Sequence, residues 1–189
     1  MTVELPMRFE DHRLLWTVDG IYSAQECAER VALIERSAPV GATQNVSFRD
    51  MDRVMIDDGP GARDLFERLR PHLPQKLGVF ELVGLNERLR YYRYRPGQKF
   101  TPHMDHWYRP SADQITLLTV LVYFNSGFEG GQTRFMEQLE GEVVPEPGRV
   151  AIFQHKIRHE GCPVISGTKY AMRTDVIYRA DGPIGHVTL

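Results

Sequence analysis

The sequence has few cysteines, no excess of basic charge and no long apolar stretch. Of its 189 residues only Cys27 and Cys162 are cysteines, too few for the disulfide framework of a small secreted protein. The 23 Lys and Arg residues face 25 Asp and Glu, so nucleic-acid binding through bulk positive charge is not expected. The longest apolar stretches, Leu117 to Phe124 and Arg149 to Phe153, are far shorter than the roughly 18 residues of a membrane-spanning helix. We therefore expect no membrane partner.

The amino-terminal residues also lack a secretory signal. Met1 to Pro6 has neither a basic start nor a continuous apolar stretch, and we expect a cytoplasmic protein. With 42% hydrophobic and 25% charged residues, the composition is ordinary for a globular domain. We find no internal repeat, low-complexity tract or linker, so residues 1–189 are expected to form one domain. The oligomeric state is left open.

The first third of the chain carries helical patterns. Ser23 and Glu26 form a capping-box pattern, followed by apolar residues at helical spacing, which predicts a helix from about Ala24 to Ser37. A second helix is predicted to open at Pro60, and its apolar face consists of Leu65, Phe66, Leu69 and Leu73. We expect residues 1–84 to be helical support. Within them the polar segment from Val40 to Gly59 is interpreted either as a lid over the site or as a strand or surface loop.

From about Leu85 the pattern changes to short runs rich in β-branched and aromatic residues, separated by turn residues. Many short strands without interleaved helices are typical of a sandwich or barrel, so we expect a mainly β fold with supporting helices and a core at about residues 85–179. The predicted strands are Glu87 to Arg95, Ile115 to Asn125, Gln132 to Met136, Arg149 to Phe153 and Lys169 to Arg179.

Two of these strands have a polar face. The period of two places Lys169, Arg173 and Asp175 on one face of the last strand. The strand before the Pro96-Gly97 turn has a similar face, made of Arg88, Arg90, Tyr92 and Tyr94. These faces point either to solvent or into a polar cavity inside a barrel.

Three residues have the chemistry of a metal site. In an extended segment His103 and Asp105 point to the same side, and His159 lies just after a later strand. Two imidazoles and one carboxylate form the 2-His-1-carboxylate facial triad, typical of non-haem Fe(II) oxygenases, although zinc could use the same ligands. His106 points the other way. The pair His155 and His159 has the spacing of a helical zinc site, but the flanking residues argue against a helix.

The order of motifs resembles the 2-oxoglutarate and Fe(II)-dependent dioxygenases, and within them the prolyl 4-hydroxylase-like branch. The resemblance extends from about Leu85 to Tyr178. It rests on Tyr94-x-x-Gly97-x-x-Phe100-x-x-His103-x-Asp105, on Gly130-Gly131-Gln132-Thr133-Arg134-Phe135, on the strand Gly148 to Phe153, and on His159-Glu160-Gly161-x-x-Val164-x-x-Gly167-x-Lys169. It implies a double-stranded β-helix, or jelly-roll, core with helices packed on one side.

The resemblance also implies roles for individual residues. His103, Asp105 and His159 would be the iron ligands, and Lys169 would hold the far carboxylate of 2-oxoglutarate with help from Tyr94. Arg173 is the rival cation. It shares a face with Lys169 but lies roughly 13 Å farther along the strand, so one carboxylate cannot suit both. We favour Lys169, because its ten-residue step from His159 is the spacing of the branch that the sequence resembles, and because Arg173 has Asp175 as a possible structural partner. Arginine would otherwise be the stronger carboxylate ligand through its two-pronged geometry.

The expected function is that of a 2-oxoglutarate- and Fe(II)-dependent dioxygenase. It would hydroxylate a C–H bond of a peptidyl residue, such as proline, or of a small molecule, using O2 and releasing succinate and CO2, with ascorbate as a candidate reductant. The alternative is a non-enzymatic, cupin-like protein that binds a metal or small ligand. That protein would show no 2-oxoglutarate turnover.

Overall fold

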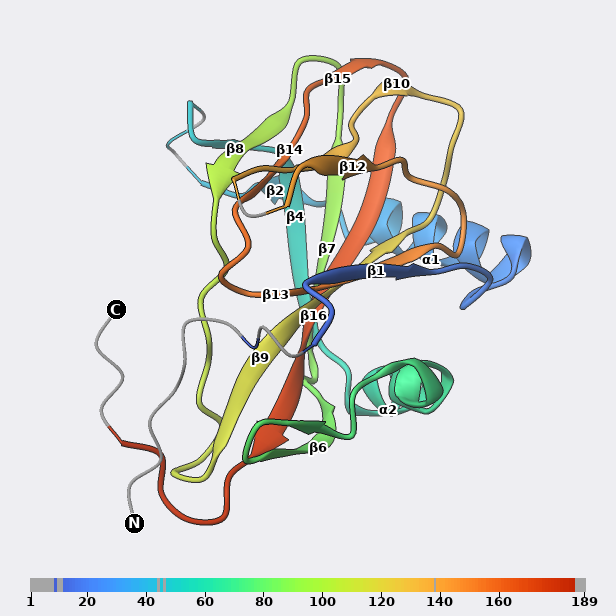
Figure 1. Ribbon diagram of the computed structural model, residues 1–189. Helices are drawn as coiled ribbons and strands as arrows, with labels where there is room; N and C mark the ends of the chain where they lie inside the picture. Colours follow the sequence, from blue (N-terminus) through green and yellow to red (C-terminus); the bar gives the residue numbers. More distant parts are fainter. Residues whose placement is uncertain (1–8, 10–11, 44, 46, 138, 186–189) are drawn as a thin grey trace.

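A computed structural model describes residues 9, 12–43, 45, 47–137 and 139–185, which form a β structure with two α-helices on one side (Figure 1). Its amino-terminal elements are β1 (Leu15–Val18), α1 (Ala24–Arg36), β2 (Val40–Gly41), β3 (Arg49–Asp50), β4 (Asp52–Asp57), α2 (Gly59–Leu69), a 3-10 turn (Arg70–His72), β5 (Lys76–Leu77) and β6 (Phe80–Leu85). The later strands are β7 (Arg88–Tyr94), β8 (Lys99–His103), β9 (Gln114–Tyr123), β10 (Glu129–Gly130), β11 (Thr133–Phe135), β12 (Gly141–Val143), β13 (Val150–Gln154), β14 (His159–Gly161), β15 (Val164–Ser166) and β16 (Lys169–Arg179).

Two antiparallel sheets make up most of the structure. The large sheet has the order β1-β13-β9-β16-β7-β4-β2, with β6 added beside β16. The small sheet has the order β12-β11-β14-β8-β3, and β10 and β15 form a separate pair. The sheets face each other around an interior to which both contribute side chains. The expected mainly β fold with supporting helices, built on a two-sheet jelly-roll core, is confirmed.

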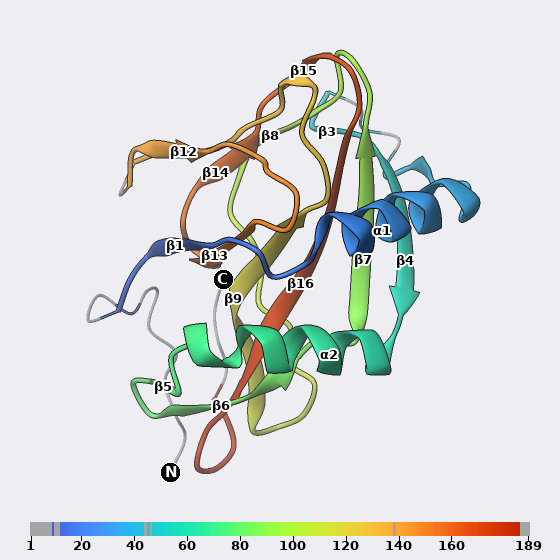
Figure 2. The ribbon, with the colours of Figure 1, turned by 90° about the vertical axis from the view of Figure 1, so that its right-hand side faces the viewer.

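Both helices cover the outer face of the large sheet (Figure 2). The predicted capping box is present at the start of α1, where the Ser23 side chain accepts from the Glu26 N–H and Glu26 accepts from the Ser23 N–H. Asp58 caps α2, with Pro60 in its first turn. The apolar faces of both helices pack on the sheet through fully buried Ile34, Leu65 and Leu69.

The prediction that residues 1–84 are mainly helical support is wrong in part. Besides the two helices this region contains β1 to β6, and β4 pairs with β7 along its whole length within the large sheet. The described part of the segment from Val40 to Gly59 contains β2, β3 and β4, in line with the strand interpretation, whereas a role as a lid stays a prediction. Its Val54 and Ile56 pack against the helix-covered core, while Arg53 and Met55 alternate with them. This period-two pattern is short and interrupted by charged residues. It is weaker than the helical patterns on either side, so the sequence did not predict a strand here.

The polar face of β16 and part of that of β7 point into the interior. β16 begins and ends where the sequence predicted, and its Lys169, Arg173 and Asp175 are largely buried. Tyr92 and Tyr94 of β7 line the same cavity as Lys169 and Arg173. The interpretation of a polar cavity inside the barrel is confirmed for these residues, whereas Arg88, at the other end of the β7 face, is exposed to solvent. Within the described ranges, neither helix is long and apolar enough to cross a membrane.

Candidate metal centre and cavity

The three predicted ligands meet at one point between the sheets. His103 ends β8, Asp105 follows two residues later, and His159 begins β14. Pairing of β8 with β14 places His159 directly opposite His103. The Nε2 atoms of both imidazoles lie 3.8 Å from carboxylate oxygens of Asp105, and one candidate ligand atom from each residue lies within 4.8 Å of the others. Residues 56 positions apart are thus brought to one site by strand pairing.

Backbone carbonyls orient both imidazoles. Nδ1 of His103 lies 2.7 Å from the carbonyl oxygen of Thr101, and Nδ1 of His159 lies 2.9 Å from that of Ile157. When each Nδ1–H donates to its carbonyl oxygen, Nε2 carries no hydrogen and its lone pair is free on the side of Asp105. Burial lowers the pKa of His103 to about 4 and also lowers that of His159. Neutral imidazoles are the form that a metal ion requires.

Asp105 is held as an ionised carboxylate. Burial alone would raise its pKa, but the Arg173 guanidinium and the nearby imidazoles outweigh burial and lower the pKa to about 2. Arg173 donates to one carboxylate oxygen at 2.8 Å, and the Thr119 hydroxyl donates to the other at 2.5 Å. The donor set is therefore two neutral nitrogens and one charged oxygen, all preoriented. This set fits a divalent iron ion.

A buried lysine lies in the same cavity without a counter-charge. The Nζ atom of Lys169 donates to the carbonyl oxygen of Gly131 at 2.6 Å and lies 5.1 Å and 5.4 Å from the ring centres of Tyr94 and Tyr123. Within the described part of the chain, no carboxylate lies at ion-pair distance from it. Burial lowers the pKa of Lys169 to about 8. A buried ammonium without an anion fits a ligand that brings a carboxylate with it.

Arg173 differs from Lys169 in having two carboxylate partners, although its Nε atom has no hydrogen-bond partner among the described residues. Its guanidinium contacts Asp105 at 2.8 Å and Asp175 at 2.9 Å, and Asp175 also accepts from Arg90 at 3.0 Å. His155 is buried beside this network, with its Nε2 atom 3.5 Å from Asp175. The structure thus brings all six predicted residues around one cavity, but it gives the two cations different surroundings.

Sequence reasoning missed two threonines. Thr119 bonds Asp105, and the Thr133 hydroxyl lies 2.7 Å from that of Tyr123 in the cavity wall. Both threonines lie on strands that the sequence predicts. The sequence does not show which side chain of another strand each hydroxyl would contact. Tyr94 was predicted, and register places it directly opposite Lys169.

The other candidate residues lie outside the ligand group. His106 is exposed, as expected from the alternation of the extended segment. Arg134, which belongs to the Gly130–Phe135 motif, forms an ion pair with Glu160 at 3.1 Å. Trp107 is half-buried, and the Lys156 ammonium lies 4.3 Å from its ring centre.

Comparisons with known proteins agree with this geometry. Residues 89–174 match the 2OG-Fe(II) oxygenase superfamily. The chain is 24% identical to a probable prolyl 4-hydroxylase 6 from Arabidopsis thaliana, over 90% of this chain and 73% of that protein.

Solved structures share the fold. A viral collagen prolyl hydroxylase from Paramecium bursaria Chlorella virus-1, in complex with 2OG, has a TM-score of 0.65 and 22% identity over 90% of this chain and 98% of that one. A Pseudomonas putida prolyl-4-hydroxylase has a TM-score of 0.68 and 20% identity over 89% and 94%. A Trichoplax adhaerens prolyl hydroxylase bound to a hypoxia-inducible-factor peptide has a TM-score of 0.66 and 17% identity over 88% and 84%.

Proposed function

Because residues 89–174 match the 2OG-Fe(II) oxygenase superfamily and the chain is similar to prolyl hydroxylases, we propose that it is a 2-oxoglutarate- and Fe(II)-dependent dioxygenase that hydroxylates a prolyl residue. Its co-substrates are 2-oxoglutarate and O2, and its co-products are succinate and CO2. The observation that carries the proposal is the His103, Asp105 and His159 group beside a buried lysine without a counter-charge. A cupin-like binding protein has no need of this combination.

His103, Asp105 and His159 would hold Fe(II). When bound, the metal supplies the oxygen and radical chemistry, coupled to decarboxylation of the keto acid. The carbonyls of Thr101 and Ile157 keep each imidazole in the tautomer that offers Nε2. Three protein ligands leave three positions for exogenous groups.

Lys169 would bind the far carboxylate of 2-oxoglutarate, assisted by Tyr94. Lys169 is the buried cation that needs an anion. Tyr94 lies directly opposite Lys169 on β7, and both residues line the cavity. Arg173 is a weaker candidate because two carboxylates already neutralise it. The apolar cavity wall, including Phe153, Leu121 and Ala171, excludes water from the region where the keto acid would lie.

The substrate side of the proposal rests on two supports. Several named relatives are prolyl hydroxylases, and one of those structures contains a peptide. An open groove of about 520 Å³ is lined by Arg88 and Arg90, on the face of β7 that carries Tyr92 and Tyr94 into the cavity. The groove shares no lining residue with the metal cavity, and we propose it as the place for a peptide segment at some distance from the reacting residue. The single domain and the cytoplasmic location stay predictions.

The test compares two histidines that lie 53 residues apart in sequence and differ in position relative to the site. Succinate release and a product heavier by one oxygen atom, about 16 Da, are measured by mass spectrometry with Fe(II), 2-oxoglutarate, ascorbate and a proline-containing peptide. His159→Ala is expected to reduce turnover by more than the roughly 100-fold typical for losing an outer-shell partner of a metal ligand. His106→Ala, at an exposed position, should leave turnover nearly unchanged.

Undiminished succinate release by His159→Ala would contradict the metal assignment. Absence of any 2-oxoglutarate turnover by the iron-loaded wild-type protein would favour the cupin-like alternative.

A further inference from the structure

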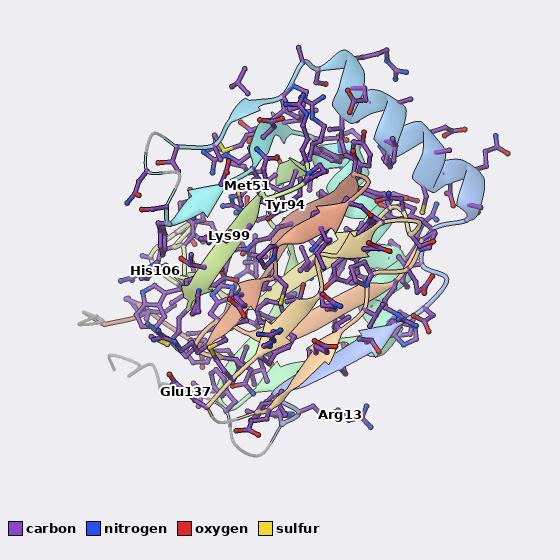
Figure 3. All side chains as sticks on the ribbon, turned by 90° about the horizontal axis from the view of Figure 1, so that it is seen from above. Arg13, Met51, Tyr94, Lys99, His106 and Glu137 are labelled. Carbon is purple, nitrogen blue, oxygen red and sulfur yellow. The ribbon has the colours of Figure 1, made fainter. Side chains whose placement is uncertain are left out.

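Two arginines stand where the chain crosses from the small sheet to the large one. Arg49 belongs to β3 of the small sheet, Arg53 belongs to β4 of the large sheet, and the buried Met51 lies between them. Met51 packs in one apolar cluster with Tyr92 and Tyr94. Figure 3 shows Met51 and Tyr94 close together, with Lys99 of the adjacent β8 nearby. This crossing therefore borders the cavity.

Strand register directs both side chains to the cavity side. Arg49 pairs with Phe100, and Arg53 pairs with Tyr92. Paired residues in an antiparallel ladder project from the same face, and both Phe100 and Tyr92 line the cavity. The intervening Asp52 points the other way, to Arg93 and Arg95. Both guanidinium groups thus lie on the cavity side, each from a different sheet, and the charge of Arg53 acts on Arg49. The place where they approach each other is called the opening below.

The charges around the cavity are balanced except at this opening and at Lys169. Arg173 and Arg90 share Asp175, and Arg93 and Arg95 share Asp52. By contrast, the described residues supply no carboxylate at ion-pair distance to either Arg49 or Arg53.

The polar atoms of this pair are also poorly satisfied. Among the residues that the structure describes, the Nε atom of Arg49 is buried without a hydrogen-bond partner, and the side chain of Arg53 has a single hydrogen bond, a 3.4 Å contact with the carbonyl oxygen of Ala42. Arginine stays charged in proteins, so the two like charges at this opening repel each other. An arrangement of this kind is stabilised when an anion binds between the charges.

The opening is close to the metal ligands. The guanidinium carbon of Arg49 lies 4.3 Å from the ring centre of Phe100, whose ring stacks on the His103 imidazole at 3.5 Å between centres. One stacked ring therefore separates the Arg49 charge from a candidate metal ligand. Since adjacent Cα atoms are about 3.8 Å apart, a group bound by Arg49 would belong to the oxidised residue or to its neighbour.

We propose that Arg49 and Arg53 form a subsite for a carboxylate of the substrate, at the residue that is hydroxylated or immediately next to it. The proposal rests on the proposed hydroxylase function and names its substrate class. The carboxylate is either the α-carboxylate of proline, free or at a peptide's end, or the side chain of an adjacent acidic residue. Arg49 and Arg53 are specificity residues, and Lys169 serves a different carboxylate.

Three matched pairs of substrates separate these sources. The first pair is a pentapeptide with Glu or Gln next to its proline, the second a pentapeptide ending in proline as the acid or the amide, and the third free L-proline or L-prolinamide. The ratio of kcat/KM for acid over neutral member is measured from the hydroxylated product. We expect a ratio of about tenfold or more for at least one pair, as for one charge-assisted contact.

Variants then assign the ratio to the subsite. Arg49→Gln is expected to bring the ratio close to one, Arg53→Gln to lower it, and Arg49→Lys to recover part of it. The control is Arg95→Gln, which removes the same charge on the chain that leads into β8 but from an arginine paired with Asp52. Arg95→Gln should keep the wild-type ratio. If Arg49→Gln does not fold, Arg53→Gln decides.

Two results would overturn the subsite. One is wild-type hydroxylation with equal kcat/KM for both members of every pair, which leaves the hydroxylase function standing. The other is an acid preference that survives both Arg49→Gln and Arg53→Gln.

If no probe is hydroxylated, prolyl hydroxylation fails and binding decides the subsite. Calorimetry of the Mn(II)- and 2-oxoglutarate-loaded protein then compares the acid and neutral members of all three pairs. Tighter binding of an acid member that is lost in Arg49→Gln supports the subsite, and equal binding within every pair overturns it.

Discussion

Lys169 and Arg173 lie on the same face of β16, yet their surroundings are opposite. Lys169 is fully buried and Arg173 is largely buried, and both line one cavity. Arg173 contacts two carboxylates, whereas the ammonium of Lys169 has a backbone carbonyl and two aromatic rings. Burial alone therefore does not identify a ligand-binding cation. The missing counter-charge does, because a buried charge is costly unless something pairs with it.

The two cations should consequently serve different ends. Arg173 holds Asp105 in place and balances Asp175, so its contribution is to the folded state and to the shape of the metal centre. Lys169 lowers stability until an anion arrives, so its contribution is to binding. Each cation can be replaced by methionine, an apolar side chain of similar length. We expect the Arg173 variant to lose stability and the Lys169 variant to lose 2-oxoglutarate binding.

The largest effect is expected for Arg173→Met. The change leaves Asp175 short of one of its cations and Asp105 without an ion-pair partner, and both carboxylates are almost fully buried. Removal of one partner from a buried ion pair costs about 3–5 kcal/mol. The free energy of unfolding, from urea denaturation of the metal-free protein, should fall by about that amount.

Arg90→Met is the matched control for this change. It removes a cation from the same Asp175 while Arg173 keeps both carboxylates paired, and it should cost clearly less. Equal losses of stability in the two variants would show that Arg173 has no special place in the network.

Lys169→Met should leave stability intact and remove co-substrate binding. Loss of an unpaired buried charge removes a desolvation cost, so the free energy of unfolding should not fall. The affinity for 2-oxoglutarate, measured by calorimetry on Mn(II)-loaded protein without O2, should drop by roughly two orders of magnitude, or about 2.7 kcal/mol. If Arg173→Met instead causes that drop while Lys169→Met binds normally, the assignment of the cations is reversed.

The sequence predicted the elements whose local signals are strong. The capping box at Ser23 and the long alternation from Lys169 to Arg179 led to correct boundaries, because caps and period-two patterns are local. Most strands of two or three residues, such as β3 and β14, carry too little pattern to be recognised, although β11 was predicted as Gln132 to Met136. They exist because neighbouring strands pair with them.

The candidate site shows the same division between local and long-range information. His103 and Asp105 were predicted from their spacing, and His159 and Lys169 from the order of motifs. The contacts that tune them were not predictable, because Arg173 meets Asp105, and Thr119 meets the same carboxylate, only across strands. Likewise nothing in the sequence showed that Arg49 and Arg53 would lack carboxylate partners while Arg93 and Arg95 share Asp52.

The smallest expected effect is the pH dependence of stability, which should differ between Lys169 and Arg173. The pKa of Lys169 is lowered by burial to about 8 from an ordinary value of 10.5. In the ligand-free protein the cost of this charge is fully present below pH 8 and disappears as pH rises through 10.5, so its contribution to stability rises across that window. Arg173 stays charged throughout, since its carboxylate partners raise its pKa despite burial.

Binding of 2-oxoglutarate should change in the opposite sense. The anion needs the protonated lysine, so affinity should weaken by up to about tenfold per pH unit above pH 8. Calorimetric titrations of Mn(II)-loaded protein between pH 7 and 9.5, about the range set by that pKa, measure the slope. In Lys169→Met, whose residual affinity is low, the slope should vanish. A slope retained in that variant would assign the titration to another group and remove Lys169 from the role of carboxylate anchor.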